Sequence, residues 1–140
     1  MPLCYDDVAE LLSRYSATIK ADLEQLARLA LFNRAINNTD DHARNFSFIH
    51  RGDGHRLSPA YDLVPNLAVG ECHAAGFGDG PRPPRPSEVP RLGKVLGLSK
   101  PWIQACAEEI LSALDGWPRF AEQAGLDESE CNHIADRFNP

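Results

Sequence analysis

The chain has 140 residues, 43% of them hydrophobic, which predicts one globular domain with its own core. Lys and Arg number 14 against 20 Asp and Glu, so the net charge of −6 has the wrong sign for direct nucleic-acid binding or for an anionic membrane surface. Four separated Cys without a CxxC pair indicate reduced thiols, and the lack of a signal peptide or a membrane-length apolar run predicts a cytoplasmic protein.

Residues 1–37 are predicted to be helical. Val8, Leu11 and Leu12 stand at helical spacing in YDDVAELLSRY, and KADLEQLARLALFNRAIN continues as a longer helix. Residues 26–36 are apolar almost all round, which predicts that this half of the helix runs through the centre of the domain. The helix therefore gives the segment that follows it a rigid support.

Residues 38–62 are predicted to form a polar loop and a β-hairpin. The stretch INNTDDHARNFSF, at 36–48, gathers Asn, Asp and His side chains between a helical and a strand-like pattern. FSFIH then alternates, RGDG is a turn signal and HRLS returns, so the hairpin is expected within residues 46–58. The loop is thus the place where several oxygen ligands could meet.

The rest of the chain divides into a loop and a helical tail. Residues 66–86 hold four Gly and four Pro in 21 positions, which predicts a long surface loop. Residues 87–140 are predicted to be helical, with Ser87 and Ser99 as N-caps, Pro101 in a first turn, and PRFAEQAG and DESECNHIADRF as later helices. The predicted core residues between these helices are the tail aromatics Trp102, Trp117, Phe120 and Phe138.

The hairpin brings two oxygen-bearing side chains towards each other. The midpoint between Asn45 and Asp62 falls in the predicted turn, so a tight hairpin folds these residues back towards one another. One amide and one carboxylate oxygen suit Mg²⁺, which fills its other positions with water and substrate phosphates. Asp40, five residues before Asn45, is then free to orient or deprotonate an attacking hydroxyl. The three residues together predict phosphoryl transfer.

Each of these residues also has a structural interpretation. Asp and Asn beside a helix end often satisfy backbone groups in Asx turns, and for any one of them alone that interpretation is favoured. The three together, at these spacings around a hairpin, favour chemistry. Asp41 and Arg44 have no assigned chemical role and are interpreted as a solvated or loop-stabilising pair.

NNTDDHARNFSF followed by LSPAYDLVPN resembles the catalytic core of the HipA-like serine/threonine protein kinases, the toxin halves of bacterial toxin-antitoxin pairs. WPRFAEQAG resembles that family's C-terminal lobe, so the resemblance covers most of the chain. It implies a mainly α fold with a small β-hairpin, as in the C-terminal lobe of a protein-kinase-like fold. It also implies that Asp40 is the catalytic aspartate, that Asn45 and Asp62 bind the metal, and that His42 supports the loop by hydrogen bonding.

Parts of a complete kinase are not found in this sequence. A kinase of this type also needs a glycine-rich loop over the phosphates and a strand lysine, both in an N-terminal lobe. The lone lysine before Asp40 is Lys20, which stands at a helix start, and the Gly-rich residues 76–80 follow the catalytic loop. The chain thus resembles half a kinase, with an incomplete site for ATP and Mg²⁺, and the isolated chain is expected to be inactive.

Three functions stay open at this point. The resemblance implies a kinase lobe that acts on a protein such as an aminoacyl-tRNA synthetase, with a helix-turn-helix antitoxin or a missing N-lobe as partner. Aminoglycoside and lipid kinases use related Asp, Asn and Asp placements, although LSPAYDLVPN favours the first function. The third alternative is a non-catalytic remnant that binds an antitoxin or a full-length relative.

Overall fold

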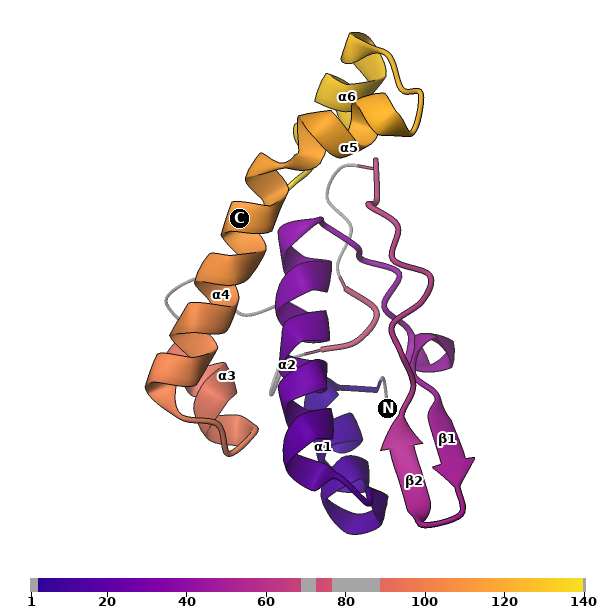
Figure 1. Ribbon diagram of the computed structural model, residues 1–140, viewed down its shortest axis with the longest axis vertical. Helices are drawn as coiled ribbons and strands as arrows, with labels where there is room; N and C mark the ends of the chain where they lie inside the picture. The colour runs from indigo at the N-terminus through magenta and orange to yellow at the C-terminus, as the bar shows by residue number, and fades with distance from the viewer. Residues whose placement is uncertain (1–2, 69–72, 77–88, 140) are drawn as a thin grey trace.

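The computed structural model of the protein describes residues 3–68, 73–76 and 89–139. Its elements, in chain order, are α1 (Tyr5–Tyr15), α2 (Ile19–Ala35), the short 3-10 helix η1 (Ala43–Asn45), β1 (Phe48–Arg51), β2 (Gly54–Leu57), α3 (Val89–Val95), α4 (Lys100–Asp115), α5 (Trp117–Gln123) and α6 (Glu128–Ala135). Figure 1 shows α2 in the middle, the hairpin on one side, α3 and α4 on the other, and α5 and α6 at one end. The predicted mainly helical fold with one small hairpin is confirmed.

Helix α2 is the centre of the core, as its apolar second half predicted. Leu26 and Ala27 are fully buried, and Ala30, Leu31 and Ala35 are each at most 5% exposed. The helix packs against α1, β2 and α4. A helix held from several sides is stiff, so the loop that leaves its C-terminal end at Ile36 starts from a fixed position.

The hairpin is docked on the connection between α1 and α2. Its antiparallel register pairs Phe48 with Leu57, Ile49 with Arg56, His50 with His55 and Arg51 with Gly54. The buried carboxylate of Asp22 accepts a hydrogen bond from the Leu57 amide at 3.1 Å, and the Ala17 amide donates to the His55 carbonyl at 2.9 Å. These bonds fix the hairpin, predicted within residues 46–58, against the helical core.

The tail follows the predicted helices, but of its four predicted core aromatics Trp102, Trp117 and Phe138 are only half-buried. The Ser99 side chain caps α4 by accepting from the Trp102 amide at 3.3 Å, whereas the proposed cap Ser87 and most of residues 66–86 lie outside the described residues. Trp117 packs edge-on against Phe138, with ring centroids 5.6 Å apart. The prediction for Phe120 is wrong: it is 51% exposed, because the short α5 buries only Ala121.

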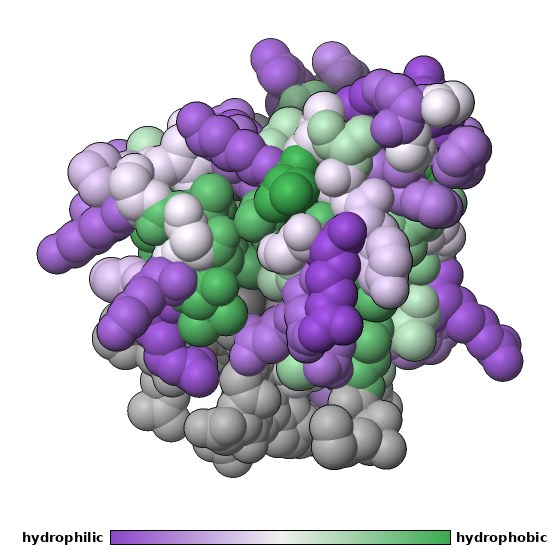
Figure 2. All heavy atoms as spheres, turned by 90° about the horizontal axis from the view of Figure 1, so that it is seen from below, coloured by the Kyte–Doolittle hydropathy of each residue, from purple (hydrophilic) through white to green (hydrophobic). Residues whose placement is uncertain are grey.

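Apolar side chains also reach the surface at the end of the molecule where α1 and the hairpin lie. Leu11 and Tyr15 of α1 are 42% and 60% exposed, and Ile19 at the start of α2 is 43% exposed. Figure 2, which views the molecule from below, shows hydrophobic areas between hydrophilic ones on this side. None of the helices in the described ranges is long and apolar enough to cross a membrane.

Gly93→Ala should destabilise the fold by about 1 to 2 kcal/mol. A Cβ at this position of α3 would lie 2.9 Å from Cγ2 of Ile103, a fully buried and stiff β-branched residue of α4. The gain in helix propensity, about 1 kcal/mol, offsets only part of this overlap. Urea unfolding measures the change, with Gly52→Ala in the hairpin turn as the control because nothing lies within 4 Å of its added Cβ. Equal stabilities of Gly93→Ala and the wild type would contradict the packing described.

Candidate active site

The polar loop between α2 and β1 is closed by its own residues. The Asn45 side-chain amide donates to the backbone carbonyl of Asp40 at 2.8 Å, and the Asn45 backbone amide donates to the His42 carbonyl at 2.9 Å. The Asp40 side chain is 78% exposed. The loop therefore holds the Asp40 backbone while leaving its carboxylate open to a ligand.

The His42 ring lies beside Asp40. Its Nε2 is 3.8 Å from Oδ1 of Asp40, within ion-pair distance when the ring is protonated. Its Nδ1 is buried and has no hydrogen-bond partner among the described residues. Support of the loop by a His42 side-chain hydrogen bond stays a prediction, since the bonds described above that close the loop are donated by Asn45.

Asp62 lies on a segment that runs beside the loop. The Tyr61 hydroxyl donates to the Arg44 carbonyl at 2.6 Å, and the Asn38 side-chain amide donates to the Asp62 carbonyl at 3.4 Å. Further bonds join Ser58 to Ser47 and Asn66 to Asn37. The segment that bears Asp62 is thus tied to the loop on both sides of this residue, while a cation shared by Asn45 and Asp62 stays a prediction.

The backbone of Asp62 has an uncommon conformation. Its φ is 56°, in the left-handed region that non-glycine residues seldom adopt, although Asp and Asn do so more readily than most. The side chain is exposed. Non-glycine residues held in this way cluster at functional sites, where the surrounding contacts must compensate for the strain.

Asp41 is the residue whose role the sequence analysis missed. It is fully buried: Oδ2 accepts from the Tyr5 hydroxyl at 2.9 Å and lies 2.9 Å from Nδ1 of His73, while Oδ1 accepts from the Ala75 amide at 3.0 Å. The prediction that Asp41 pairs with Arg44 is wrong, because the buried Asp41 carboxylate is held by other residues, whereas Arg44 is exposed, as the solvated alternative predicted. Asp41 does stabilise the loop, but with partners that are distant in sequence.

Tyr5 extends this buried polar group towards α2. Its hydroxyl accepts from the Asn33 side-chain amide at 3.0 Å, and the Asn38 side-chain amide donates to Oδ1 of Asn33 at 3.1 Å. Burial, reinforced by the charge of Asp41, raises the pKa of Tyr5 well above its usual range. The phenol therefore stays protonated at neutral pH and acts as a hydrogen-bond donor to Asp41.

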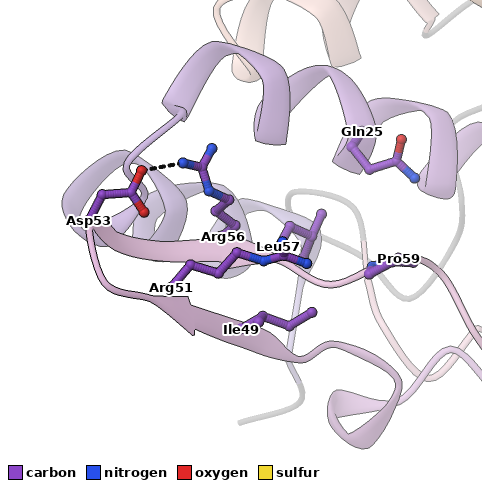
Figure 3. Close-up of a pocket in the computed structure, with 7 residues that line it drawn as sticks. All are labelled: Gln25, Ile49, Arg51, Asp53, Arg56, Leu57 and Pro59. Atoms are coloured by element: carbon purple, nitrogen blue, oxygen red, sulfur yellow. Dashed lines mark hydrogen bonds and ion pairs between the residues drawn. The ribbon is translucent and has the colours of Figure 1, made fainter.

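A pocket of the structure lies on the hairpin rather than at Asp40. Its volume is about 640 Å³, and its lining residues come from α2, the hairpin and the strand exit: Gln25, Ile49, Arg51, Asp53, Arg56, Leu57 and Pro59. Figure 3 shows Arg56 turned towards Asp53, with which it pairs at 2.5 Å. Among the described residues, no three His, Cys, Asp or Glu side chains form a group that could hold a metal ion.

Comparison with known families decides the membership of the chain. The family described as the HipA-like C-terminal domain matches residues 3–139. The chain belongs to this family. Its HipA-like C-terminal domain thus comprises nearly the whole sequence, in agreement with the resemblance of NNTDDHARNFSF and LSPAYDLVPN.

Two relatives place the HipA-like domain within longer proteins. A protein of Sinorhizobium fredii (strain NBRC 101917 / NGR234), named "Putative kinase Y4mE", is 30% identical over 122 residues, which are 87% of this chain and 24% of the relative. HipA of Shewanella oneidensis MR-1, solved with HipB and operator DNA, has the same fold, with a TM-score of 0.74 and 21% identity. That match covers 96% of this chain and 33% of HipA. The chain therefore spans about a quarter to a third of these proteins.

Proposed function

We propose that this HipA-like domain is the C-terminal catalytic lobe of a serine/threonine protein kinase, which transfers the γ-phosphate of ATP·Mg to a protein hydroxyl. The observation that carries the proposal is the closed loop that exposes the Asp40 carboxylate while Asn45 holds the Asp40 backbone. The segment of Asp62 runs beside that loop. Phosphoryl transfer is catalysed mainly by positioning the substrates and neutralising charge. It therefore needs an exposed carboxylate such as Asp40 and, for a metal, oxygen ligands such as Asn45 and Asp62.

The residues present fit a magnesium ion that arrives with a nucleotide. The side-chain amide nitrogen of Asn45 is engaged with Asp40, so its Oδ1 is the atom available to a cation. The exposed carboxylate of Asp62 supplies the second hard oxygen. Such a pair suits Mg²⁺, which takes one or two protein ligands and completes its shell with water and phosphate oxygens. When bound, the ion would neutralise charge on the phosphates.

Asp40 is assigned to the acceptor side of the reaction. Its exposed carboxylate can accept a hydrogen bond from a Ser or Thr hydroxyl and take the proton as the bond to phosphorus forms. Because the hydrogen bond from Asn45 goes to the Asp40 backbone, the side-chain oxygens stay free for this task. The protein contributes orientation and a proton acceptor.

The partners proposed for the chain follow its relatives. The Shewanella HipA was solved with HipB and operator DNA, and we expect a helix-turn-helix antitoxin of that kind, or an N-lobe, to bind this chain. The net charge of −6 argues against direct contact with DNA. A protein substrate such as an aminoacyl-tRNA synthetase, and a cytoplasmic location, belong to the same proposal.

A binding role without catalysis is the second candidate. The observation that favours it is that the chain matches only part of each relative, 24% of Y4mE and 33% of HipA. Exposed Leu11, Tyr15 and Ile19 offer apolar contact to another protein surface. The two candidates differ in one measurable property, because only the first gains nucleotide binding when an N-lobe is supplied.

The isolated chain should bind ATP·Mg more weakly than with micromolar affinity. Fusion of a HipA-type N-lobe to residue 1 should bring the affinity into the micromolar range. Asn45 and Asp62 supply only part of the contacts, and no glycine-rich strand-turn-strand that could cover phosphates occurs among the described residues. Isothermal calorimetry with and without Mg²⁺ measures both affinities. Micromolar binding by the 140-residue chain alone would contradict the incomplete site, and a fusion that folds but binds no ATP·Mg would favour the second candidate.

A further inference from the structure

Buried polar side chains connect the loop of Asp40 with the segment of Asp62. The side chains of this hydrogen-bonded run are each at most 7% exposed, and Asp62 takes part through its backbone carbonyl alone. In order, the run passes through the Asp62 carbonyl, Asn38, Asn33, Tyr5, Asp41 and His73. Buried polar groups that are fully hydrogen-bonded make a region rigid, and those left unpaired are costly.

The direction of this run is fixed at the Asp62 end. A backbone carbonyl can only accept, so the side-chain nitrogen of Asn38 must face Asp62 and donate its other hydrogen to Oδ1 of Asn33. The nitrogen of Asn33 then donates to the Tyr5 hydroxyl. The one hydrogen of that hydroxyl is left for Asp41. Each amide therefore has one orientation that satisfies its neighbours.

The other end of the run defines the state of His73. Asp41 accepts from Tyr5 at Oδ2 and from the Ala75 amide at Oδ1, and these two donors compensate in part for burial of the carboxylate. Because Oδ2 is an acceptor, Nδ1 of His73, 2.9 Å away, must carry a hydrogen. The same segment is held by a bond from the Ala74 amide to the Thr39 carbonyl at 2.9 Å.

We propose that Asp41 is a positioning residue, which through Tyr5, Asn33 and Asn38 sets the placement of Asp40 relative to Asp62. Asp41 is the chain neighbour of Asp40, so its buried anchor fixes the backbone that bears the exposed carboxylate. At the far end, Asn38 holds the carbonyl of Asp62, whose left-handed backbone needs outside support. The catalytic meaning of this coupling rests on the proposed function, whereas the coupling itself is a property of the chain.

Tyr5→Phe interrupts the run with little loss of packing. The hydroxyl disappears, so Asn33 loses an acceptor and Asp41 loses a donor, while the ring keeps its edge-on contact with Phe46 at 5.4 Å between centroids. Tyr15→Phe is the matched control, because Tyr15 lies on the same helix, is 60% exposed, and its hydroxyl makes no hydrogen bond within the described residues. The control thus removes the same atom from the same helix, but at an exposed position outside the run.

Nuclear magnetic resonance on the 140-residue chain tests the coupling without any activity. In Tyr5→Phe, the backbone signals of Asp62 and Ala75 should both shift, and exchange of the Ala75 amide hydrogen should accelerate about five- to tenfold, the scale of one lost hydrogen bond. Tyr15→Phe should change neither. Shifts confined to the surroundings of Tyr5, with Asp62 unchanged, would overturn the proposal.

The wild-type chain provides a second test in case Tyr5→Phe does not fold. The ¹⁵N shifts of the His73 ring should show a hydrogen on Nδ1, and a bare Nδ1 at neutral pH would overturn the assignment of Asp41 as acceptor.

In the chain fused to an N-lobe, Tyr5→Phe should lower kcat about tenfold with KM for ATP unchanged. An unchanged kcat in an active fusion would overturn the positioning role. A wild-type fusion without activity would defeat the proposed function instead, and the NMR result would still decide the coupling.

Discussion

Asp40→Asn is expected to lower the rate of phosphoryl transfer by about 10²-fold or more in the chain assembled with an N-lobe, the scale of lost general-base help. ATP binding should be nearly unchanged. The reason is local: the hydrogen bond from Asn45 goes to the Asp40 carbonyl, so the substitution keeps the loop closed and alters only an exposed side chain. Initial rates with a validated protein substrate and calorimetry with ATP·Mg measure the two effects separately.

Asp136→Asn is the control for this prediction, because it removes the same charge from an exposed residue at the end of α6. It should leave both rate and affinity unchanged. If Asp40→Asn transfers phosphate as fast as the wild type, the role assigned to Asp40 is wrong. The loop would then be an Asx-rich turn that ends a helix.

Loss of either proposed metal ligand, Asp62 or Asn45, should act on ATP binding as well as on rate. Asp62→Asn removes the charge but keeps a side chain that tolerates the left-handed backbone at φ 56°, so it separates metal binding from strain. We expect it to weaken the Mg²⁺-dependent ATP affinity of the assembled protein by about 10²-fold. Loss of a residue that only supports a metal ligand costs about 10- to 100-fold, and a direct ligand should cost at least as much. Asn45→Ala should do the same and lower kcat further, because it also frees the Asp40 carbonyl.

Magnesium titrations at fixed ATP measure these affinities. Asp53→Asn, in the hairpin turn between Asn45 and Asp62, is a suitable control because its side chain pairs with Arg56 rather than with the loop. Unchanged magnesium dependence in both Asp62→Asn and Asn45→Ala would mean that the cation binds elsewhere. A loss in Asp62→Ala that Asp62→Asn does not reproduce would indicate backbone strain as the cause.

The elements that could be predicted from the sequence depend on neighbours in the chain. The apolar second half of α2 and the alternation around RGDG are local patterns, and the structure has the helix at 19–35 and the strands at 48–51 and 54–57. The hairpin itself is confirmed, and the segment of Asp62 returns beside the loop through bonds from Asn38 to the Asp62 carbonyl and from Tyr61 to the Arg44 carbonyl.

Asp41 could not be predicted in this way because its donors are far away in sequence. Tyr5, His73 and Ala75 lie 36, 32 and 34 residues from it, and none of them stands in a polar motif. Tyr5 occupies a buried position of an amphipathic helix, where a tyrosine is ordinarily counted as core. The hydrogen bond from its hydroxyl to Asp41 depends on tertiary packing, which local sequence patterns do not show. Phe120 shows the opposite error, because an aromatic residue in a short helix was assigned to a core that the helix does not reach.

The most direct test of the account is transfer of labelled γ-phosphate from ATP·Mg by this chain fused at residue 1 to a HipA-type N-lobe, followed by mass spectrometry of the acceptor protein. The account predicts phosphate on Ser or Thr hydroxyls, dependent on Mg²⁺ and lost in Asp40→Asn. In the proposed function, Asp40, Asn45 and Asp62 form one half of the site and the lobe supplies the other. A folded fusion that binds ATP·Mg but transfers no phosphate to any protein would contradict it.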